Sequence, residues 1–304
     1  VATSPIIGLA LGSGASRGWS HVGVIKALLK EGAEPDVVCG TSVGAMVGGS
    51  YVAGNLEKLE EWVLGSTRSD VLRFFDLKFS QSGFVSVERM RRFLRNYVGE
   101  EDVLIENLPK KYVAVSADLD NGREFWFRKG ILAHAVRASM AMPGLFPAVR
   151  HNDRWLVDGG LVNPVPVSAC HALGAEIVIA VNLNSDIVGK RLRKASPVMT
   201  EQQEGVLSSL KQQARQYSSS LFPHNEKKDE PLSLIGAISS SINIFQDRIT
   251  RSRLAGDPAD VVLSPKLGDM GILEFSRAAD AMREGEECVQ AALPEIRRAI
   301  GASD

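Results

Sequence analysis

Apolar residues along the chain form short runs that alternate with segments of helical spacing. The runs that predict buried strands are residues 6–11, 37–39, 112–117, 124–127, 155–157, 177–181 and 261–263. The segments with apolar residues every three or four positions, which predict helices, are 19–29, 43–53, 131–140, 165–173, 273–284 and 287–300. A parallel strand buried on both faces is apolar throughout. The alternation therefore predicts an α/β fold with a mostly parallel central sheet flanked by helices.

Residues 186–230 interrupt this pattern. Gln, Lys, Ser and Glu replace the large apolar residues there, and Pro197 and Pro223 break the remaining periodicity. Such a composition buries too little apolar surface to order itself, so we predict a polar, flexible or loosely helical insertion. We expect residues 1–304 to form a single domain that contains this insertion.

A helix with one apolar stripe follows the insertion. The stripe consists of Ile235, Ile238, Ile242, Phe245 and Ile249. Such a stripe predicts a contact with the core or with a partner, including a second copy of the chain in a homo-oligomer. A lid that faces lipid is the alternative.

Composition excludes several classes of protein. The 304 residues are 44% hydrophobic and carry 35 basic against 36 acidic side chains, so the chain has no basic surplus for nucleic acid. Its three cysteines, at wide spacing, fit neither a disulfide framework nor a cysteine zinc site, and they favour a reducing, cytoplasmic location. No apolar run approaches the ~18 residues that span a bilayer. The chain begins at Val1 rather than Met, which leaves open a targeting segment that has been removed.

The first candidate for chemistry is Gly40-Thr41-Ser42-Val43-Gly44, a G-x-S-x-G pattern between a predicted strand and a predicted helix. A nucleophilic serine needs a turn so tight that side chains two residues away on either side would clash, and Gly40 and Gly44 satisfy this need. The helix that starts here also favours developing negative charge. The alternative is that Ser42 merely caps this helix.

A glycine-rich loop, residues 12–18, follows the first predicted strand. Its third glycine comes one position too late for a dinucleotide fingerprint, and it lacks the Gly-Lys-Ser/Thr of a P-loop. Backbone N–H groups on such a loop can bind an anion, including the oxyanion of acyl transfer. A simple tight turn is the other interpretation.

A base for Ser42 has two candidate sources. Asp158, in Asp158-Gly159-Gly160, follows a predicted strand, although Asp-Gly is also a common hairpin signal. A histidine triad would need a histidine after that acid, and only His171 and His224 qualify. His171 lies in a predicted helix and His224 in the polar insertion, so Asp158 acting directly is favoured.

These pieces together resemble the patatin-like phospholipase family, and in particular the small bacterial RssA-like members related to neuropathy target esterase. The resemblance rests on four blocks in the family's order: GSGASRGWSHVG at 12–23, GTSVG at 40–44, ASMAMPGLFP at 138–147 and DGG at 158–160. It implies a three-layer α/β/α fold, a Ser42–Asp158 catalytic dyad without histidine, and an oxyanion hole from Gly12, Ser13 and Gly14. It implies no metal or cofactor.

The expected activity is hydrolysis of acyl esters of (lyso)phospholipids. Burial would raise the pKa of Asp158 enough for it to act as a base, and the acid limb of activity should then lie above about pH 4. Two alternatives stay open: a His-triad carboxylesterase or thioesterase, and a non-catalytic scaffold whose oxyanion loop is altered by Ser13 and Ser16.

Contacts with lipid form the last group of expectations. Arg17, after the glycine loop, would attract a lipid phosphate headgroup or pair with a surface acid. Residues 88–97 form an amphipathic segment with apolar Met90, Phe93, Leu94 and Tyr97 on one face. Its arginines suit an anionic membrane surface, although a helix docked on the core with a solvated basic face is favoured.

Overall fold

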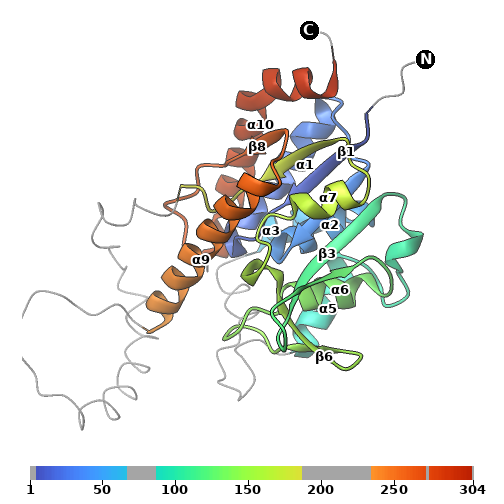
Figure 1. The fold of residues 1–304 in the computed structure, drawn as a ribbon, viewed down its shortest axis with the longest axis vertical. Coiled ribbons are helices and arrows are strands. Elements are labelled where there is room, and N and C mark those ends of the chain that lie inside the picture. Colours follow the sequence, from blue (N-terminus) through green and yellow to red (C-terminus); the bar gives the residue numbers. More distant parts are fainter. Residues whose placement is uncertain (1–4, 67–86, 187–233, 272–273, 303–304) are drawn as a thin grey trace, which may run out of the picture.

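Figure 1 shows the fold in a computed structural model. The structure describes residues 5–66, 87–186, 234–271 and 274–302, and for 234–239 it describes the backbone alone. The predicted polar insertion at 186–230 lies, apart from Asp186, outside the described residues. The described chain has an eight-stranded sheet in the order β5-β6-β3-β2-β1-β7-β8, with β4 also paired to β3. The strands are β1 (Ile7–Leu11), β2 (Val37–Thr41), β3 (Lys111–Asp118), β4 (Glu124–Phe127), β5 (Val149–His151), β6 (Arg154–Asp158), β7 (Ile177–Val181) and β8 (Val261–Leu263).

The sheet is parallel through its middle and antiparallel at one edge. Strands β3, β2, β1, β7 and β8 pair in parallel, whereas β4, β5 and β6 join by antiparallel pairing. Every residue of β1 and β2 is buried, as the unbroken apolar runs predicted. The apolar runs predicted at 112–117 and 124–127 form the antiparallel pair of β3 and β4.

Helices cover both faces of the sheet. They are α1 (Ser20–Lys30), α2 (Val43–Val52), α3 (Leu56–Gly65), α5 (Val87–Tyr97), α6 (Leu132–Ser139), α7 (Val167–Ala172), α9 (Leu234–Gly256) and α10 (Ala278–Ile300), with short 3-10 turns η1 (Ala15–Trp19), η2 (Ile105–Asn107), η3 (Gly159–Leu161) and η5 (Phe275–Arg277). Leu9 and Leu11 belong to a large core with α1, α2 and α10, whereas Ala10 faces a smaller core under α7. This arrangement, a helix layer on each face, is the predicted three-layer α/β/α fold.

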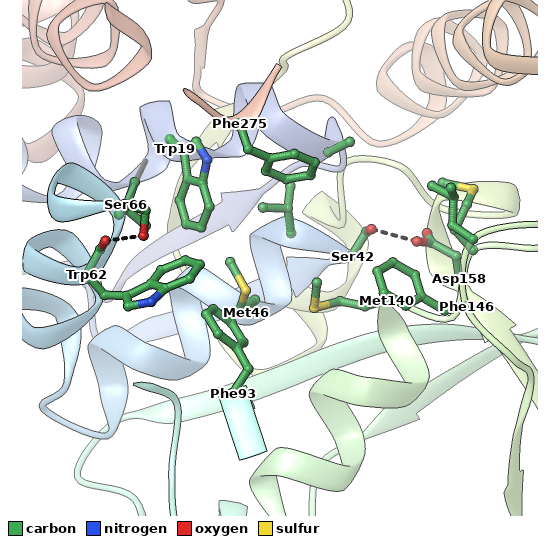
Figure 2. A pocket seen from close by; sticks show the side chains of 15 residues that line it. Trp19, Ser42, Met46, Trp62, Ser66, Phe93, Met140, Phe146, Asp158 and Phe275 are labelled. Atoms are coloured by element: carbon green, nitrogen blue, oxygen red, sulfur yellow. Dashed lines mark hydrogen bonds between the residues drawn. The ribbon is translucent and has the colours of Figure 1, made fainter. Parts of the chain in front are cut away.

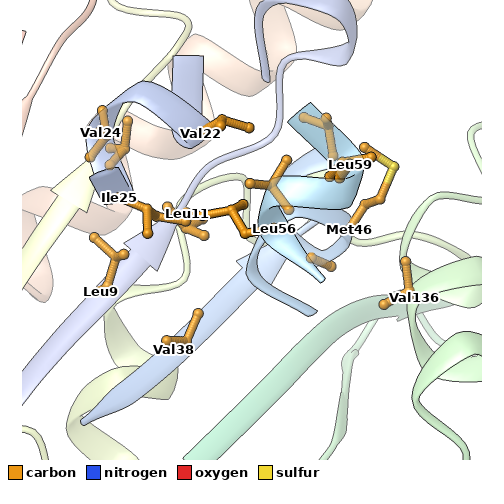
Figure 3. Packing of buried hydrophobic residues seen from close by; sticks show 14 of the residues in the cluster. Leu9, Leu11, Val22, Val24, Ile25, Val38, Met46, Leu56, Leu59 and Val136 are labelled. Atoms are coloured by element: carbon orange, nitrogen blue, oxygen red, sulfur yellow. The ribbon is translucent and has the colours of Figure 1, made fainter. Parts of the chain in front are cut away.

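The larger core places the first helices against the carboxyl ends of β1 and β2. Figure 3 shows Leu9 and Leu11 of β1 beside Ile25 of α1, and Val22 and Val38 belong to the same buried cluster. Helices α1 and α10 approach closely because glycines stand at their crossing. A Cβ at Gly23 would lie 2.0 Å from the carbonyl oxygen of Met282, and one at Gly285 would lie 2.2 Å from that of Ser20.

Two predicted elements differ from the structure. The C-terminal segment is one helix, α10, and not two, because the helix continues through residues 285 and 286, where a break was predicted. The apolar stripe of α9 was predicted to contact the core or a partner. The predicted core contact is wrong for Phe245, which is 59% exposed. The buried face of α9 is polar instead and consists of Asn243, Gln246, Asp247 and Thr250.

Candidate active site

Ser42 lies at the sharp turn between β2 and α2. Its backbone has a φ of 58°, a conformation that is strained for a residue with a side chain. A Cβ at Gly40 would lie 2.4 Å from the backbone nitrogen of Ala45, and one at Gly44 would lie 2.2 Å from the carbonyl oxygen of Leu11. The two glycines therefore permit the turn as predicted, and the turn carries the Ser42 hydroxyl beyond the end of the sheet.

Two side chains hold this turn in place. The backbone N–H of Ser42 donates to Ser139 Oγ at 2.9 Å, and Ser139 Oγ donates in turn to the Val115 carbonyl at 2.5 Å. Thr41 Oγ1 donates to the Asn163 carbonyl at 2.8 Å. Ser139 fixes the strained residue to β3 through the end of α6. Reasoning from the sequence assigned it no role, although it lies in the ASMAMPGLFP block.

Asp158 ends β6 directly beside the nucleophile. The Ser42 hydroxyl donates to Asp158 Oδ2 at 2.6 Å (Figure 2). The N–H of Gly160 donates to Asp158 Oδ1 at 2.7 Å. Burial raises the pKa of Asp158 from 3.8 to about 6, although both hydrogen bonds oppose the rise. The carboxylate thus lies within reach of the hydroxyl proton and is more basic than an ordinary aspartate.

The glycine-rich loop follows β1 and lies close to this pair, but only part of it is free to bind an anion. The N–H of Gly12 donates to the Val181 carbonyl at 3.1 Å, and that of Ser13 donates to the Pro164 carbonyl at 2.8 Å. Of the three predicted oxyanion donors, only Gly14 has no hydrogen-bond partner for its N–H among the described residues. Of the predicted oxyanion donors, only the N–H of Gly14 therefore stays available. The N–H of Val43, the residue after Ser42, is the natural second donor to an oxyanion.

The two serine hydroxyls of this loop differ, because that of Ser13 is buried without a hydrogen-bond partner among the described residues whereas that of Ser16 is bonded. Ser16 Oγ donates to the Gly271 carbonyl at 2.7 Å, which ties the loop to the C-terminal part of the chain. Ser13 is buried, and a Cβ at Gly160 would lie 3.2 Å from the Cβ of Ser13. Ser13 therefore packs against the backbone beside Asp158.

Arg17 lies inside the protein and not at a headgroup site. Only 1% of its surface is exposed. Its Nε donates to the Gly14 carbonyl at 3.2 Å, and its Nη2 donates to Asn243 Oδ1 at 2.9 Å. Arg17 is therefore too buried to contact a lipid headgroup or an acid at the surface, as was expected of it. Its guanidinium instead joins the glycine-rich loop to α9.

The polar face of α9 braces the loop at a second point. Asn184 Nδ2 donates to the Ser13 carbonyl at 3.3 Å and to Gln246 Oε1 at 3.1 Å. Two carbonyls of the glycine-rich loop, those of Gly14 and Ser13, are thus held by side chains that α9 orients. No sequence pattern indicated this role, because the apolar stripe of α9 drew attention to the opposite face.

An apolar cavity opens beside Ser42. It has a volume of about 70 Å³. Its walls are Ala15, Trp19, Ser42, Val43, Met46, Trp62, Val63, Ser66, Phe93, Met140, Met142, Leu145, Phe146, Asp158 and Phe275. In Figure 2, Met140 and Phe146 lie near the Ser42–Asp158 pair, and Trp19, Trp62 and Phe93 surround the part farther from it. Apart from the Ser42–Asp158 pair and Ser66, the lining side chains are apolar or nearly so, as suits an aliphatic chain.

The histidines of the described chain lie elsewhere. His21 is buried with its Nε2 2.7 Å from the Gly12 carbonyl, and burial lowers its pKa to about 4 despite that contact. His134 and His151 pair with each other, and His171 contacts the Pro258 carbonyl. None of these four bonds to Ser42 or Asp158, whereas His224 lies outside the described residues.

No group of three or more His, Cys, Asp and Glu side chains in the described chain is arranged to hold a metal ion. No helix there has both the length and the apolarity needed to cross a membrane.

Comparison with known proteins places this site in a family. The profile of the patatin-like phospholipases matches residues 9–171. The uncharacterized NTE family protein Rv1063c of Mycobacterium tuberculosis is 32% identical, covering 96% of this chain and 92% of that protein. The lysophospholipase NTE1 of Candida albicans is 32% identical over 61% of this chain, which spans 14% of that protein.

Among solved structures, VipD from Legionella pneumophila aligns with a TM-score of 0.37 and 13% identity, covering 98% of this chain and 80% of that one. A TM-score this low gives the alignment no weight. The family profile and the mycobacterial relative are sufficient, because both extend over more than half of the chain and the profile includes the Ser42 turn and Asp158. The chain belongs to the patatin-like phospholipase family, and to its NTE branch of lipid ester hydrolases.

Proposed function

We propose that the protein is a serine hydrolase that cleaves acyl esters of phospholipids and lysophospholipids through a Ser42–Asp158 dyad. The 2.6 Å hydrogen bond from Ser42 Oγ to the buried Asp158 carboxylate carries this proposal. It provides a nucleophile and a base in direct contact. A third residue to orient the base is unnecessary, because the Gly160 N–H already fixes the other carboxylate oxygen.

The reaction begins with attack of Ser42 Oγ on the ester carbonyl carbon while Asp158 takes the hydroxyl proton. The resulting oxyanion accepts hydrogen bonds from the N–H groups of Gly14 and Val43. Collapse of this intermediate breaks the bond to the leaving alcohol, which receives the proton from Asp158. Water then attacks the acyl-enzyme while Asp158 takes its proton, and Asp158 passes this proton to Ser42 Oγ as the bond to the fatty acid breaks.

The apolar cavity supports a lipid as the substrate. It opens directly at Ser42, so an aliphatic chain that lies in it places its ester carbonyl at the nucleophile. Met46, Met140 and Met142 line it, and the unbranched methionine side chain adapts to flexible ligands. These features favour a long-chain acyl ester over a small polar one.

The engaged hydroxyl of Ser16 and the available N–H of Gly14 weigh against the non-catalytic scaffold. Ser16 uses its hydroxyl on the Gly271 carbonyl, and the Gly14 N–H has no partner among the described residues. A His-triad mechanism would need a histidine at Ser42, and the four described histidines have other contacts.

A fluorophosphonate probe tests the dyad, because it labels an activated serine without the correct lipid. We expect the wild type to gain the mass of one probe, Ser42→Ala to gain none, and Asp158→Asn to react about 10²–10⁴-fold more slowly. Asp118→Asn, a change at another buried carboxylate, should label like the wild type. A well-folded wild type that does not label, or an Asp158→Asn variant that labels at the wild-type rate, would refute the proposal.

The same proteins test the substrate class. Release of fatty acid from a long-chain lysophospholipid should exceed that from a short-chain ester of the same alcohol, because the long chain contacts more of the apolar lining between Ser42 and Trp62. Replacing Trp62 by Ala should weaken this preference. Equal rates for the two chain lengths would contradict the lipid assignment while leaving the dyad intact.

A further inference from the structure

A second cavity lies between α5 and α6, away from Ser42 and Asp158. It has a volume of about 300 Å³ and is lined by Arg91, Arg95 and Glu101 on one side and by His134 and Arg137 on the other. Leu94, Ile131 and Ala133 complete its walls. We call it the arginine cavity. Its polar, cationic lining contrasts with the apolar cavity at the nucleophile.

The positive charges of this cavity are incompletely balanced. Arg95 has a partner, Glu101, at 3.7 Å. Arg91 and Arg137 form no ion pair or hydrogen bond within the described chain. They are close enough that burial, together with the charge of Arg91, lowers the pKa of Arg137. Two guanidinium groups that face one cavity and repel each other form a site whose natural complement is an anion.

His134 adds a neutral polar group to the same cavity. Burial, together with the nearby Arg137, His151 and Arg91, lowers its pKa to about 4. Its Nε2 lies 3.2 Å from Nδ1 of His151, so the ring is held in a fixed orientation. At neutral pH the ring is uncharged, and the net positive charge of the cavity comes from its arginines.

Arg137 connects this cavity to the catalytic region. A small cavity of about 10 Å³ lies between Arg137 and Phe146, and Phe146 also lines the apolar cavity. Arg137 stands two residues before Ser139, which bonds the backbone of Ser42. The arginine cavity therefore lies next to the acyl-binding region without sharing the catalytic residues.

We propose that the arginine cavity binds a phosphate group, with Arg91 and Arg137 as its principal ligands. The forked guanidinium suits phosphate oxygens, and a phosphate monoester brings between one and two negative charges to offset the two unpaired cations. The phosphate has two sources, the headgroup of a phospholipid or a soluble phosphate ester. The inference does not depend on the proposed ester hydrolysis, since neither arginine takes part in it.

Binding is tested with glycerol 3-phosphate on the full chain carrying Ser42→Ala, which removes any turnover. Isothermal titration calorimetry should give saturable binding. Adding Arg91→Gln or Arg137→Gln should weaken it by about tenfold to a hundredfold, as expected for loss of a charge-assisted hydrogen bond. Arg92→Gln is the matched control, because Arg92 is an exposed arginine on the same helix that does not line the cavity. It should change the affinity less than twofold.

Kinetics on the protein with Ser42 intact separate the two sources. If the site holds the headgroup of the substrate, Arg91→Gln and Arg137→Gln raise KM for a lysophospholipid and leave KM for the monoacylglycerol of the same chain unchanged. If the site holds a soluble phosphate ester, glycerol 3-phosphate binds but KM for the two lipids moves equally or not at all. Either result supports the site and assigns its ligand.

Two results would overturn the proposal. One is the absence of saturable glycerol 3-phosphate binding by the Ser42→Ala protein. The other is an equal loss of affinity in Arg92→Gln and Arg91→Gln. That result would mean that the net positive charge of α5 attracts the phosphate without specific ligands. Arg91 is exposed, so its variant keeps the test decisive if Arg137→Gln fails to fold. A protein that hydrolyses neither lipid would refute the proposed function and leave the calorimetric result valid.

Discussion

The buried carboxylate of Asp158 should cost the protein stability, so that removing its charge stabilises the fold while abolishing catalysis. Asp158 has no exposed surface, and the partners of its carboxylate are the neutral Ser42 hydroxyl and the Gly160 N–H. Burial is the largest influence on its pKa, and the influences that oppose it are these two hydrogen bonds. Asp158→Asn keeps the shape and the acceptor for the Gly160 N–H, and removes the charge.

The pKa shift sets the size of the effect. The pKa of Asp158 rises from 3.8 in an unfolded chain to about 6 in the fold, and each pKa unit corresponds to ~1.4 kcal/mol. Above pH 6 the ionised carboxylate therefore destabilises the folded state by about 3 kcal/mol. Between pH 3.8 and 6 the folded state holds the proton that the unfolded state has lost, so the free energy of unfolding falls as the pH rises through this window. Below pH 3.8 both states are protonated and the penalty disappears.

Urea unfolding of the wild type and Asp158→Asn from pH 3.5 to 8 measures this difference. We expect Asp158→Asn to be more stable by up to about 3 kcal/mol at pH 7.5, with the advantage shrinking to nothing near pH 4. Asp158→Asn at pH 7.5 should also react far more slowly with the fluorophosphonate probe. A variant less stable than the wild type at pH 7.5, or an advantage independent of pH, would refute the reasoning.

Asp118 provides a control of opposite sign. Burial would raise its pKa, but hydrogen bonds from the Asp120 N–H, Arg154 and Asn121 outweigh burial and lower the pKa. Its ionised form therefore stabilises the fold above the unfolded pKa of 3.8, and this contribution is lost as the pH falls through the lower folded pKa. Asp118→Asn should be less stable than the wild type at pH 7.5 and should keep its catalytic activity.

Three further predictions concern the same site. The kcat/KM for an acyl ester should fall on the acid side with a midpoint near pH 6, because Asp158 must be ionised to accept the proton, and a profile flat to pH 4 would contradict this. Ser139→Ala leaves the N–H of Ser42 buried without its acceptor, so urea unfolding should show a loss of about 1–3 kcal/mol and probe labelling should slow; unchanged labelling would remove Ser139 from the site. Gly44→Ala places a methyl group 2.2 Å from a backbone oxygen, so the soluble yield and the labelling should both collapse, and a folded, active variant would refute the assigned geometry.

The sequence predicted the elements that depend on local patterns. The parallel strands were found because β1 and β2 are apolar at every buried position, and the Ser42 turn was found because glycines flank the serine. The pairing of Ser42 with Asp158 joins residues 116 positions apart, and the family resemblance supplied it more firmly than the spacing did. Roles set by distant contacts, such as that of Ser139, were invisible to pattern analysis.

The oxyanion loop shows why donors cannot be assigned from a motif alone. Its N–H groups are equivalent in the sequence, yet those of Gly12 and Ser13 are used by carbonyls of residues 181 and 164, far along the chain. A backbone N–H that is already bonded inside the protein is unavailable to an oxyanion. Of the three candidate N–H donors, only that of Gly14 is therefore available in the fold. This could be recognised only once β7 and the segment before α7 were placed beside the loop.

The buried face of helix α9 also could not be predicted from a local pattern. Helical spacing identified the helix, but hydropathy suggested that the apolar stripe faces inward, whereas Phe245 is exposed and Asn243 and Gln246 are buried. Burying amide side chains is costly unless they are hydrogen-bonded. Asn243 bonds Arg17, and Gln246 bonds the Asn184 side chain that contacts the Ser13 carbonyl, so the buried face matches the polar groups of the loop beneath it. At the catalytic end of the sheet the surface to be covered is polar, and a polar helix face is what covers it.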